Sequence, residues 1–487
     1  MPSPRPHNEP MALRPSLPGR LARFAFIAAA LALLASCLAP AAASAEVRRA
    51  DVVMGSTVEE RGLTVAQCPS IDALYACVMD ENGTVYFERD ATSPTQIASI
   101  TKIMTAVVAL DAVDSGLMSL DDRIVVSSEA AEVGESSAGL QEGDVMTLET
   151  ALYALLVPSG NDAAVAISQT VGQALLAEQG NGSASAEEGL SAFIDAMNAK
   201  ASSLGCVDTV YRNAHGLDDG EFEGDQHSCA ADQALVVQYA MSNETFRTVV
   251  ASGDTAIEVE RGGEDVSIEL QSTDGFIDMY EYACGVKTGF TDLAGPSFAG
   301  AANDGERYLY AIVIHSSSES QRFSDAQTLC EWAYGNIIDY ELANSDESMQ
   351  MTSQSLSGSV PVVAYAAHAD WIDRTVPVTL SNPEASVEVF ALNGNISQSF
   401  EFDEIHGTVH AGDRVGTATF KQRNEVVAQY DLVASQDVAA PNFFESVGIW
   451  WDRLFRSFSG SPTVAESTVV NELPLINDKT ALTDSAA

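Results

Sequence analysis

The sequence predicts an α+β domain, in which an antiparallel sheet packs against a cluster of helices, followed by a small all-β domain. Strand-like runs occur at 73–90 and again at 280–315, and helical patterns lie between them. Strands at both ends with helices between them are typical of an α+β arrangement. After about residue 343 the pattern changes to short strands separated by turns. With 487 residues, the chain is long enough for two or three domains.

Residues 1–45 have the pattern of a secretory signal peptide. Arginines between 14 and 23 precede an apolar run at 24–36, which is too short for a comfortable membrane span. The ASA sequence at 43–45 suits ordinary cleavage, whereas LASC is similar to a bacterial lipobox and would make Cys37 the lipidated residue. Both alternatives stay open, and both place the mature chain outside the cytoplasm.

The N-terminal part of the main domain begins with a predicted β-hairpin and a buried helix. Two β-rich runs in 73–90 flank Asn82-Gly83, which is a strong hairpin signal. The helix that follows, from Ile97 to Leu110, is apolar almost all the way round, and such helices are usually buried. Lys102 lies inside this apolar helix, and Ser99 shares its face one turn earlier.

The rest of the main domain, which we place at 46–342, continues with helices and then strands. Residues 148–171 read as two helices that are broken at Pro158-Ser159-Gly160-Asn161, and 187–205 reads as a helix that ends at a glycine. Three strands are expected within 280–315, and a helix at 323–337 closes the region.

The C-terminal third divides into three parts. Residues 345–438 carry the strand pattern of the small β domain. An amphipathic helix is expected at 442–458, with an aromatic face that suits a membrane surface. A helix that covers the β domain is the alternative. Residues 460–487, rich in Ser, Thr, Pro and Glu, are expected to form a disordered acidic tail.

Charge and metal-ligand spacing exclude some classes of function. The formal charge is −45, from 24 basic and 69 acidic residues, and nucleic-acid binding needs basic patches instead. No Cys or His pattern has the spacing of zinc ligands, so we expect neither a metal nor a cofactor.

Six cysteines remain after the signal peptide, an even number that permits disulfides outside the cytoplasm. We expect at least one, with Cys206–Cys229 preferred because it would close the loop-rich segment 207–228. His215 lies in that segment, and we interpret it as a structural residue.

Three short motifs carry the chemistry: Ser99-Ile100-Thr101-Lys102, Ser159-Gly160-Asn161 and Lys287-Thr288-Gly289. A serine hydroxyl is a poor nucleophile until a base takes its proton. Lys102 is the available base if burial and a second cation lower its pKa. Lys287 would be that cation if its strand lies beside the start of the helix.

This motif set occurs in penicillin-binding proteins and class A β-lactamases, here with S-G-N in place of S-D-N. The sequence resembles the serine D-Ala-D-Ala carboxypeptidases, the low-molecular-mass penicillin-binding proteins. The matching blocks are IASITKIMTA, LLVPSGNDAAVA, NAHGLD and GVKTGFTDLAG. The resemblance is strong over 70–342 and weaker over 345–437. It implies the transpeptidase fold shared by penicillin-binding proteins and β-lactamases.

The resemblance implies a role for each motif residue. Ser99 would be acylated by stem peptides, with Lys102 as base, and Ser159 and Lys287 would relay a proton to the departing amine. Asn161 would bind the substrate's amide, while Lys287 and Thr288 would bind its terminal carboxylate. Gly289 would leave room for the substrate backbone, and the backbone N–H groups of Ser99 and Phe290 would form the oxyanion hole.

Three functions remain possible at this point. The favoured one is a D-Ala-D-Ala carboxypeptidase of the bacterial cell envelope that is inhibited by β-lactams and associated with the membrane surface. A serine β-lactamase would need a glutamate for deacylation, and Glu187 and Glu188 are the candidates. The third is an inactive wall-binding protein, which the intact motifs disfavour.

Overall fold

The computed structural model describes residues 68–353 and 356–476. The signal peptide, its two possible cleavage sites, Cys37 and the chain beyond residue 476 lie outside these ranges.

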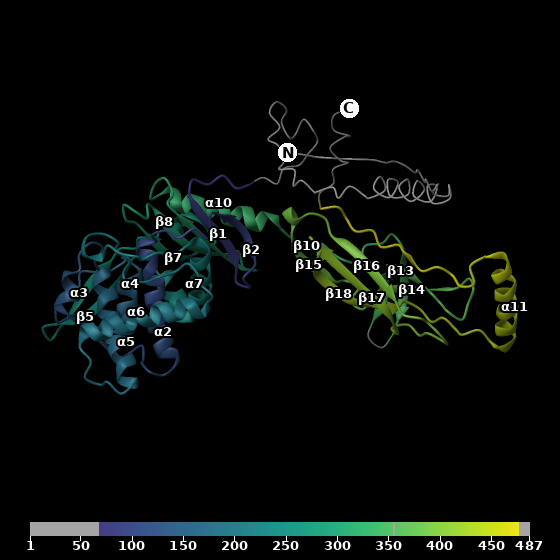
Figure 1. The fold of residues 1–487 in the computed structure, drawn as a ribbon, viewed down its shortest axis with the longest axis horizontal. Coiled ribbons are helices and arrows are strands. Elements are labelled where there is room, and N and C mark those ends of the chain that lie inside the picture. The colour runs from purple at the N-terminus through teal and green to yellow at the C-terminus, as the bar shows by residue number, and fades with distance from the viewer. Residues whose placement is uncertain (1–67, 354–355, 477–487) are drawn as a thin grey trace, which may run out of the picture. The chain divides into compact units, whose positions relative to one another are not determined.

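The first domain is built on a five-stranded antiparallel sheet with the strand order β2-β1-β9-β8-β7 (Figure 1). The first hairpin lies beside the last strand because Tyr75 pairs with Ile314. The predicted hairpin and the three predicted strands therefore form one sheet, as expected. The strands are β1 (Tyr75–Asp80), β2 (Val85–Arg89), β7 (Ala283–Gly289), β8 (Ser297–Asn303) and β9 (Tyr308–Ile314).

Helices cover both faces of this sheet. On β9, Tyr310, Ile312 and Ile314 belong to the core that the helical cluster forms. The residues between them, Leu309, Ala311 and Val313, belong to a second core with α10 (Gln321–Asn336). A strand that is buried on both faces explains the continuous apolar run YLYAIVI.

The helical cluster surrounds α2 (Thr101–Asp114), which is buried all the way round and packs against α5 and α7. The break between α4 and α5 falls where Pro158-Ser159-Gly160 predicted it. Helix α6 begins with a capping box between Ser185 and Glu188. The other helices are α3 (Ser128–Glu132), α4 (Leu148–Leu156), α5 (Asn161–Glu178), α6 (Ala186–Ser203), α7 (Ala230–Ser242), α8 (Glu244–Val250) and α9 (Phe276–Met279).

A second, four-stranded sheet at the edge of this domain was not anticipated from the sequence. It has the order β3-β4-β5-β6, with strands Arg123–Val125, Val145–Thr147, Thr255–Arg261 and Glu264–Leu270. Three-residue strands are too short to give a pattern. Strands β5 and β6 do carry a signal in the sequence. Apolar and polar residues alternate on both sides of Gly262-Gly263, which is typical of a β-hairpin.

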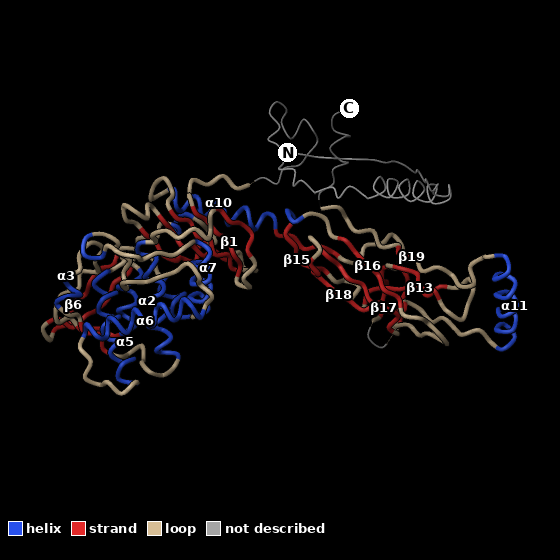
Figure 2. Tube along the Cα trace, viewed as in Figure 1, coloured by secondary structure: helices blue, strands red, loops and turns tan. Residues whose placement is uncertain are grey.

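The C-terminal region is rich in strands, as predicted (Figure 2). Its main sheet has six strands in the order β16-β17-β18-β14-β13-β19. Strand β10 begins at Ile337, before the expected boundary, and pairs with β15. The strands are β10 (Ile337–Glu341), β11 (Ser348–Thr352), β12 (Ser357–Pro361), β13 (Ala364–Ala367), β14 (Thr375–Leu380), β15 (Ser386–Phe390), β16 (Ser397–Phe402), β17 (Arg414–Gln422), β18 (Glu425–Ala434) and β19 (Thr468–Val469).

The predicted amphipathic helix is α11 (Phe443–Ser459), and none of its residues is buried. Beyond α11 the chain returns to the sheet, where β19 pairs with β13. Buried Asn471 donates from Nδ2 to the Leu342 carbonyl and to Oε1 of Gln398, each at 2.8 Å. The prediction of a disordered tail was therefore wrong for 460–476. Within the described ranges, no helix is long and apolar enough to cross a membrane.

The disulfide prediction was also wrong, because all six cysteines of the described chain are free. Cys206 and Cys229 lie on either side of Asp232 without bonding to each other. The Sγ of Cys206 is 3.5 Å from the Asp232 carbonyl, and the Asp232 N–H donates to the Sγ of Cys229 at 3.4 Å. The Asp232 carboxylate holds the segment instead, since it accepts from Asp208 N and Thr209 Oγ1.

Candidate active site

Ser99 lies in a tight turn immediately before α2. The turn is the 3-10 helix η2 (Ala98–Ile100). Ala98 has a φ of +47°, a left-handed conformation that is strained for a residue with a Cβ. Gly216 packs against this turn so closely that a Cβ there would lie 1.9 Å from the Ala98 carbonyl oxygen. Tertiary packing thus helps to hold the serine in place.

Gly289 packs against the same turn from the end of β7. A Cβ at Gly289 would lie 2.7 Å from the Ile97 carbonyl oxygen and 3.2 Å from Cγ1 of Ile100. The glycine was expected to leave room for substrate. The structure gives a different reason, since glycine is needed for the strand to approach the nucleophile's turn.

The Nζ atom of Lys102 is fully enclosed at the centre of the site. It lies 2.8 Å from Oγ of Ser99, 2.7 Å from Oδ1 of Asn161 and 3.0 Å from the His215 carbonyl oxygen. The last two atoms can only accept hydrogen bonds. A neutral amine has two N–H donors and one lone pair, so donating to both carbonyls leaves the lone pair for the Ser99 hydroxyl.

The environment favours the neutral form of Lys102. Burial lowers the pKa of Lys102 well below its usual range, and the Lys287 charge lowers it further, while Asp162 opposes the shift. Lysine in water is protonated at neutral pH, with a pKa of about 10.4. The predicted second cation is therefore present, and Lys102 is suited to accept the Ser99 proton.

Ser159 and Asn161 come from the break between α4 and α5. Ser159 has a φ of +66° and places its Oγ 3.4 Å from Nζ of Lys102. Asn161 donates from Nδ2 to the Gly134 carbonyl at 2.9 Å and accepts from Lys102. Asn161 also lines the cavity, and its expected contact with the substrate's amide stays a prediction.

Lys287 is buried on β7, and its Nζ lies 3.2 Å from the carbonyl oxygen of Thr288 and 3.3 Å from Oγ1 of that residue. Burial lowers the pKa of Lys287 to about 7; Asp274 opposes this shift, and Arg322 adds to it. Within the described chain, no hydrogen bond joins Lys287 to Ser159. The expected proton relay between them therefore stays a prediction.

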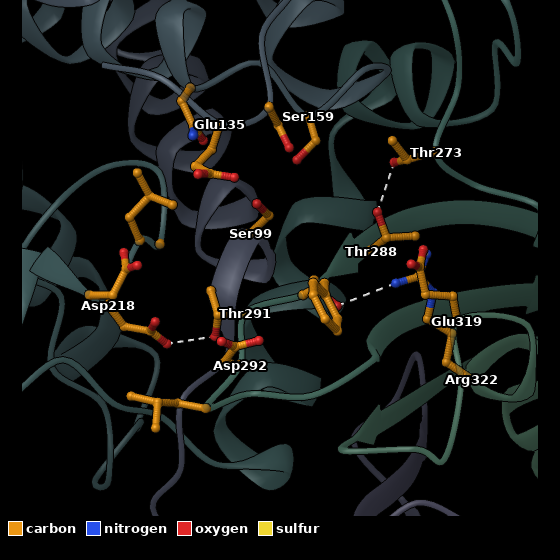
Figure 3. A pocket seen from close by; sticks show the side chains of 18 residues that line it. Ser99, Glu135, Ser159, Asp218, Thr273, Thr288, Thr291, Asp292, Glu319 and Arg322 are labelled. Carbon is orange, nitrogen blue, oxygen red and sulfur yellow. Dashed lines mark hydrogen bonds and ion pairs between the residues drawn. The ribbon is translucent and has the colours of Figure 1, made fainter.

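One cavity of about 550 Å³ brings the motif residues together, a volume in the range of small-ligand sites (Figure 3). Lys102 and Lys287 do not line it, because they are buried beneath its surface. Phe290 is 53% exposed at the cavity. The motif residues among those that line the cavity are Ser99, Ser159, Asn161, Thr288, Gly289 and Phe290.

The cavity also includes charged residues that sequence reasoning missed. Arg322 is only 5% exposed and donates from Nη1 to the Gly289 carbonyl at 3.4 Å. Glu135, with a φ of +58°, lies on the Ser159 side, and Asp218 accepts from Oγ1 of Thr291 at 2.7 Å. None belongs to a motif. In the sequence, the only indication that Arg322 matters is that basic residues are scarce, with 24 Lys and Arg against 69 Asp and Glu.

His215 and the candidate deacylation glutamates are not placed for catalysis. Burial and the nearby Lys102 charge lower the pKa of His215 to about 3, and its Nδ1 accepts from Leu217 N at 3.2 Å. This agrees with a structural role. Glu188 caps α6 by accepting from Ser185 N, and neither it nor Glu187 lines the cavity. The described ranges contain no group of three or more His, Cys, Asp or Glu residues that could hold a metal ion.

A serine that lines the cavity and a buried lysine, between a helical cluster and an antiparallel sheet and beside a Lys-Thr-Gly strand, define a serine acyl-transfer enzyme of the penicillin-binding type. The chain belongs to the D-alanyl-D-alanine carboxypeptidase family, which it matches over residues 63–318, more than half its length. Members of this family act on peptidoglycan stem peptides and bind β-lactams.

Individual relatives agree with this assignment. D-alanyl-D-alanine carboxypeptidase DacF of Bacillus subtilis is 24% identical over 76% of this chain and 87% of its own. DacD of Salmonella typhimurium is 27% identical over 78% and 89%. The solved structure of the Streptomyces K15 DD-transpeptidase is 28% identical and covers 55% of this chain and all of its own, with a TM-score of 0.51. DacD of Francisella tularensis, at 21% identity, covers 78% and 97% with a TM-score of 0.53 and shows the same fold.

Proposed function

We propose that this enzyme removes the terminal D-Ala from peptidoglycan stem pentapeptides through an acyl-enzyme on Ser99. One observation carries the assignment of the nucleophile. Nζ of Lys102 lies 2.8 Å from Oγ of Ser99 while two carbonyl oxygens occupy its N–H donors. This arrangement activates a serine at neutral pH without a histidine.

Acylation follows from the geometry. As Oγ of Ser99 attacks the carbonyl carbon of the penultimate D-Ala, its proton moves to Nζ of Lys102. The backbone N–H groups of Ser99 and Phe290 stabilise the oxyanion. The peptide bond breaks, and its nitrogen takes the proton back from Lys102 through the Ser159 hydroxyl. A water molecule then hydrolyses the ester and frees Ser99.

The terminal carboxylate of the substrate would lie at the β7 side of the cavity. Thr288 and Arg322 line the cavity there, and Lys287 lies just beneath Thr288, with its Nζ 3.3 Å from Oγ1 of that residue. This subsite fixes which peptide bond reaches Ser99. β-Lactams carry a carboxylate as well and would bind in the same orientation.

The experiment combines D-Ala release from a pentapeptide with intact-mass measurement after addition of penicillin. A carboxypeptidase gives released D-Ala and a long-lived penicilloyl adduct. Rapid penicillin turnover without D-Ala release would indicate a β-lactamase. The absence of both adduct and release would indicate a wall-binding protein and would contradict the proposal.

We further propose that the chain is exported and that α11 lies on a membrane surface. Its exposed apolar side chains include Phe443, Phe444, Trp450, Trp451, Phe455 and Phe458, each at least half exposed. Such a face is costly in water unless something covers it, and aromatic rings suit the headgroup boundary. A helix that covered the β domain would bury this face, whereas α11 buries no residue.

Hydrogen bonds from the middle of α11 to the β domain would hold the helix in a fixed orientation. Arg453 donates from Nη2 to the carbonyl oxygens of Ala369 and Trp371, and from Nε to that of Thr463. The polar side of the helix thus faces protein, and the aromatic side is left for lipid.

A further inference from the structure

Asp274 is a carboxylate next to the cavity that the mechanism above does not use. It follows Thr273, whose Oγ1 lies 2.7 Å from Oγ1 of Thr288, and it precedes α9. Oδ1 of Asp274 accepts from Phe276 N at 2.9 Å. Its Oδ2 is buried and has no hydrogen-bond partner within the described residues. A buried carboxylate oxygen without a partner costs stability, so its presence requires an explanation.

The charged residues around the site explain why a carboxylate is buried there. Lys102, Lys287 and Arg322 are three basic side chains that are almost completely buried. Asp162 is a buried acid, but its oxygens already accept from Ser137, Ala138, Leu140 and Ala163. Asp274 is the carboxylate whose charge acts on both Lys287 and Arg322.

The remaining charged neighbours lie on α9, α10 and α2. Asp278 on α9 acts on Asp274, and it is exposed. Glu319 pairs with Arg322 at 3.4 Å, but its side chain is 70% exposed and solvent screens it. The charge of Lys287 lowers the pKa of Lys102 on α2, and Lys102 acts as a neutral base in the mechanism. Since neither exposed acid acts on Lys287 directly, Asp274 is its main counter-charge.

We propose that Asp274 is a positioning residue whose carboxylate keeps the Lys287 ammonium charged, so that Lys287 can bind the terminal carboxylate of the substrate. The inference rests on the proposed function, because it assumes that the substrate carboxylate lies at Lys287. It adds a residue outside the three motifs to the binding of that group.

The direction of the effect follows from the pKa values. Burial lowers the pKa of Lys287 to about 7 even though Asp274 opposes the shift, so removing Asp274 would lower it further. Burial raises the pKa of Asp274 to about 6, while Lys287 and Arg322 oppose that shift. Asp274 is therefore ionised at neutral pH, where Lys287 would otherwise lose its proton. Below about pH 5 Lys287 is protonated with or without it.

The test is the pH profile of kcat/KM for a D-Ala-D-Ala peptide in Asp274→Asn. Asparagine keeps the acceptor for Phe276 N and removes only the charge. We expect the alkaline limb to move down by roughly one pH unit, because loss of a nearby opposite charge typically shifts a pKa by about that much or more. Above pH 8 kcat/KM should then be about tenfold lower than in wild type, chiefly through KM, while near pH 5 the two enzymes should agree.

Asp278→Asn is the matched control, because it removes an exposed charge from the same turn and should leave the profile in place. Parallel profiles for Asp274→Asn and wild type would overturn the inference. If Asp274→Asn unfolds, Asp274→Glu serves instead, since it retains the charge and should keep the wild-type alkaline limb. A shifted limb in Asp274→Glu would also overturn it. D-Ala release together with a long-lived penicilloyl adduct on Asp274→Asn at low pH would show that the proposed function stands whatever the profile.

Discussion

Lys102 was identified from the sequence because a charged residue in an all-apolar helix requires a reason. The structure shows that reason as a set of contacts, in which Nζ lies 2.8 Å from the Ser99 hydroxyl oxygen and 2.7 and 3.0 Å from two carbonyl oxygens. The S-x-x-K spacing predicted the pairing with Ser99, since residues three apart share a face. The carbonyl of His215 could not be predicted, because its contact joins positions more than a hundred residues apart.

Lys102→Arg should abolish most acylation although it keeps a cation, because guanidinium does not give up a proton at useful pH. Loss of a general base lowers the rate by roughly a hundredfold to ten-thousandfold. The measurement is the second-order rate of penicillin acylation. Lys200→Arg is the control, since Lys200 pairs with Asp111 outside the cavity. Acylation of the Lys102 variant within about tenfold of wild type would exclude Lys102 as the base.

The depressed pKa of Lys102 also predicts how stability depends on pH. Because the pKa of Lys102 is lower in the folded chain than in the unfolded one, the unfolded state binds more protons between these two pKa values, and this group makes wild-type stability rise with pH up to about pH 10.4. Lys102→Met lacks this contribution. The free energy of unfolding of wild type relative to the variant should therefore rise as the pH approaches about 10, with a slope of at most about 1.4 kcal/mol per pH unit.

Urea unfolding of both proteins at three pH values measures this difference. A difference that stays constant with pH would show that Lys102 is charged in the folded protein.

At the scale of elements, long and strongly periodic segments were predicted well, and short ones were not. The buried helix α2, the broken pair α4–α5 and the three strands of 280–315 all carry patterns over many residues. Strands β3 and β4 have three residues each, and only their pairing across the sheet defines them. The tail at 460–476 looked disordered by composition, but β19 and Asn471 fasten it through contacts that composition does not contain.

The close approach of β7 to η2 predicts that Gly289→Ala is harmful. The added Cβ would meet backbone at Ile97, which cannot move aside as a flexible side chain can. We expect a loss of about 1–3 kcal/mol in the free energy of unfolding, together with slower acylation. Gly335→Ala on α10 is the control, because nothing lies within 4 Å of its added Cβ and alanine favours helix. Equal stability of Gly289→Ala and wild type would contradict the packing argument.

At the scale of the whole molecule, the predicted α+β fold and the β-rich C-terminal region are confirmed, whereas the domain boundaries stay a prediction and membrane association stays a proposal. The chain that follows α11 pairs with the sheet through β19, and this changes how membrane association must be tested. Cutting the chain before α11 would also remove β19 and buried Asn471, so loss of the helix could not be separated from damage to the sheet. Substitutions on the helix surface avoid this.

Trp451→Glu should lower sedimentation with phosphatidylglycerol–phosphatidylethanolamine vesicles by about tenfold, because it removes a large apolar group from the proposed lipid face. D-Ala release from small peptides should not change. Ser457→Glu adds the same charge to the same helix and is the control. Equal sedimentation of Trp451→Glu and the control would rule out the aromatic face as the contact with lipid.

The central claim is that Ser99, activated by a neutral Lys102, carries the acyl group. The most direct measurement is peptide mapping of the wild-type enzyme after reaction with penicillin at pH 7, with Ser99→Ala in parallel. We predict one penicilloyl group, located on Ser99, and no adduct on Ser99→Ala. An adduct on Ser159, or one that persists in Ser99→Ala, would contradict the assignment of the nucleophile and the role of Lys102 with it.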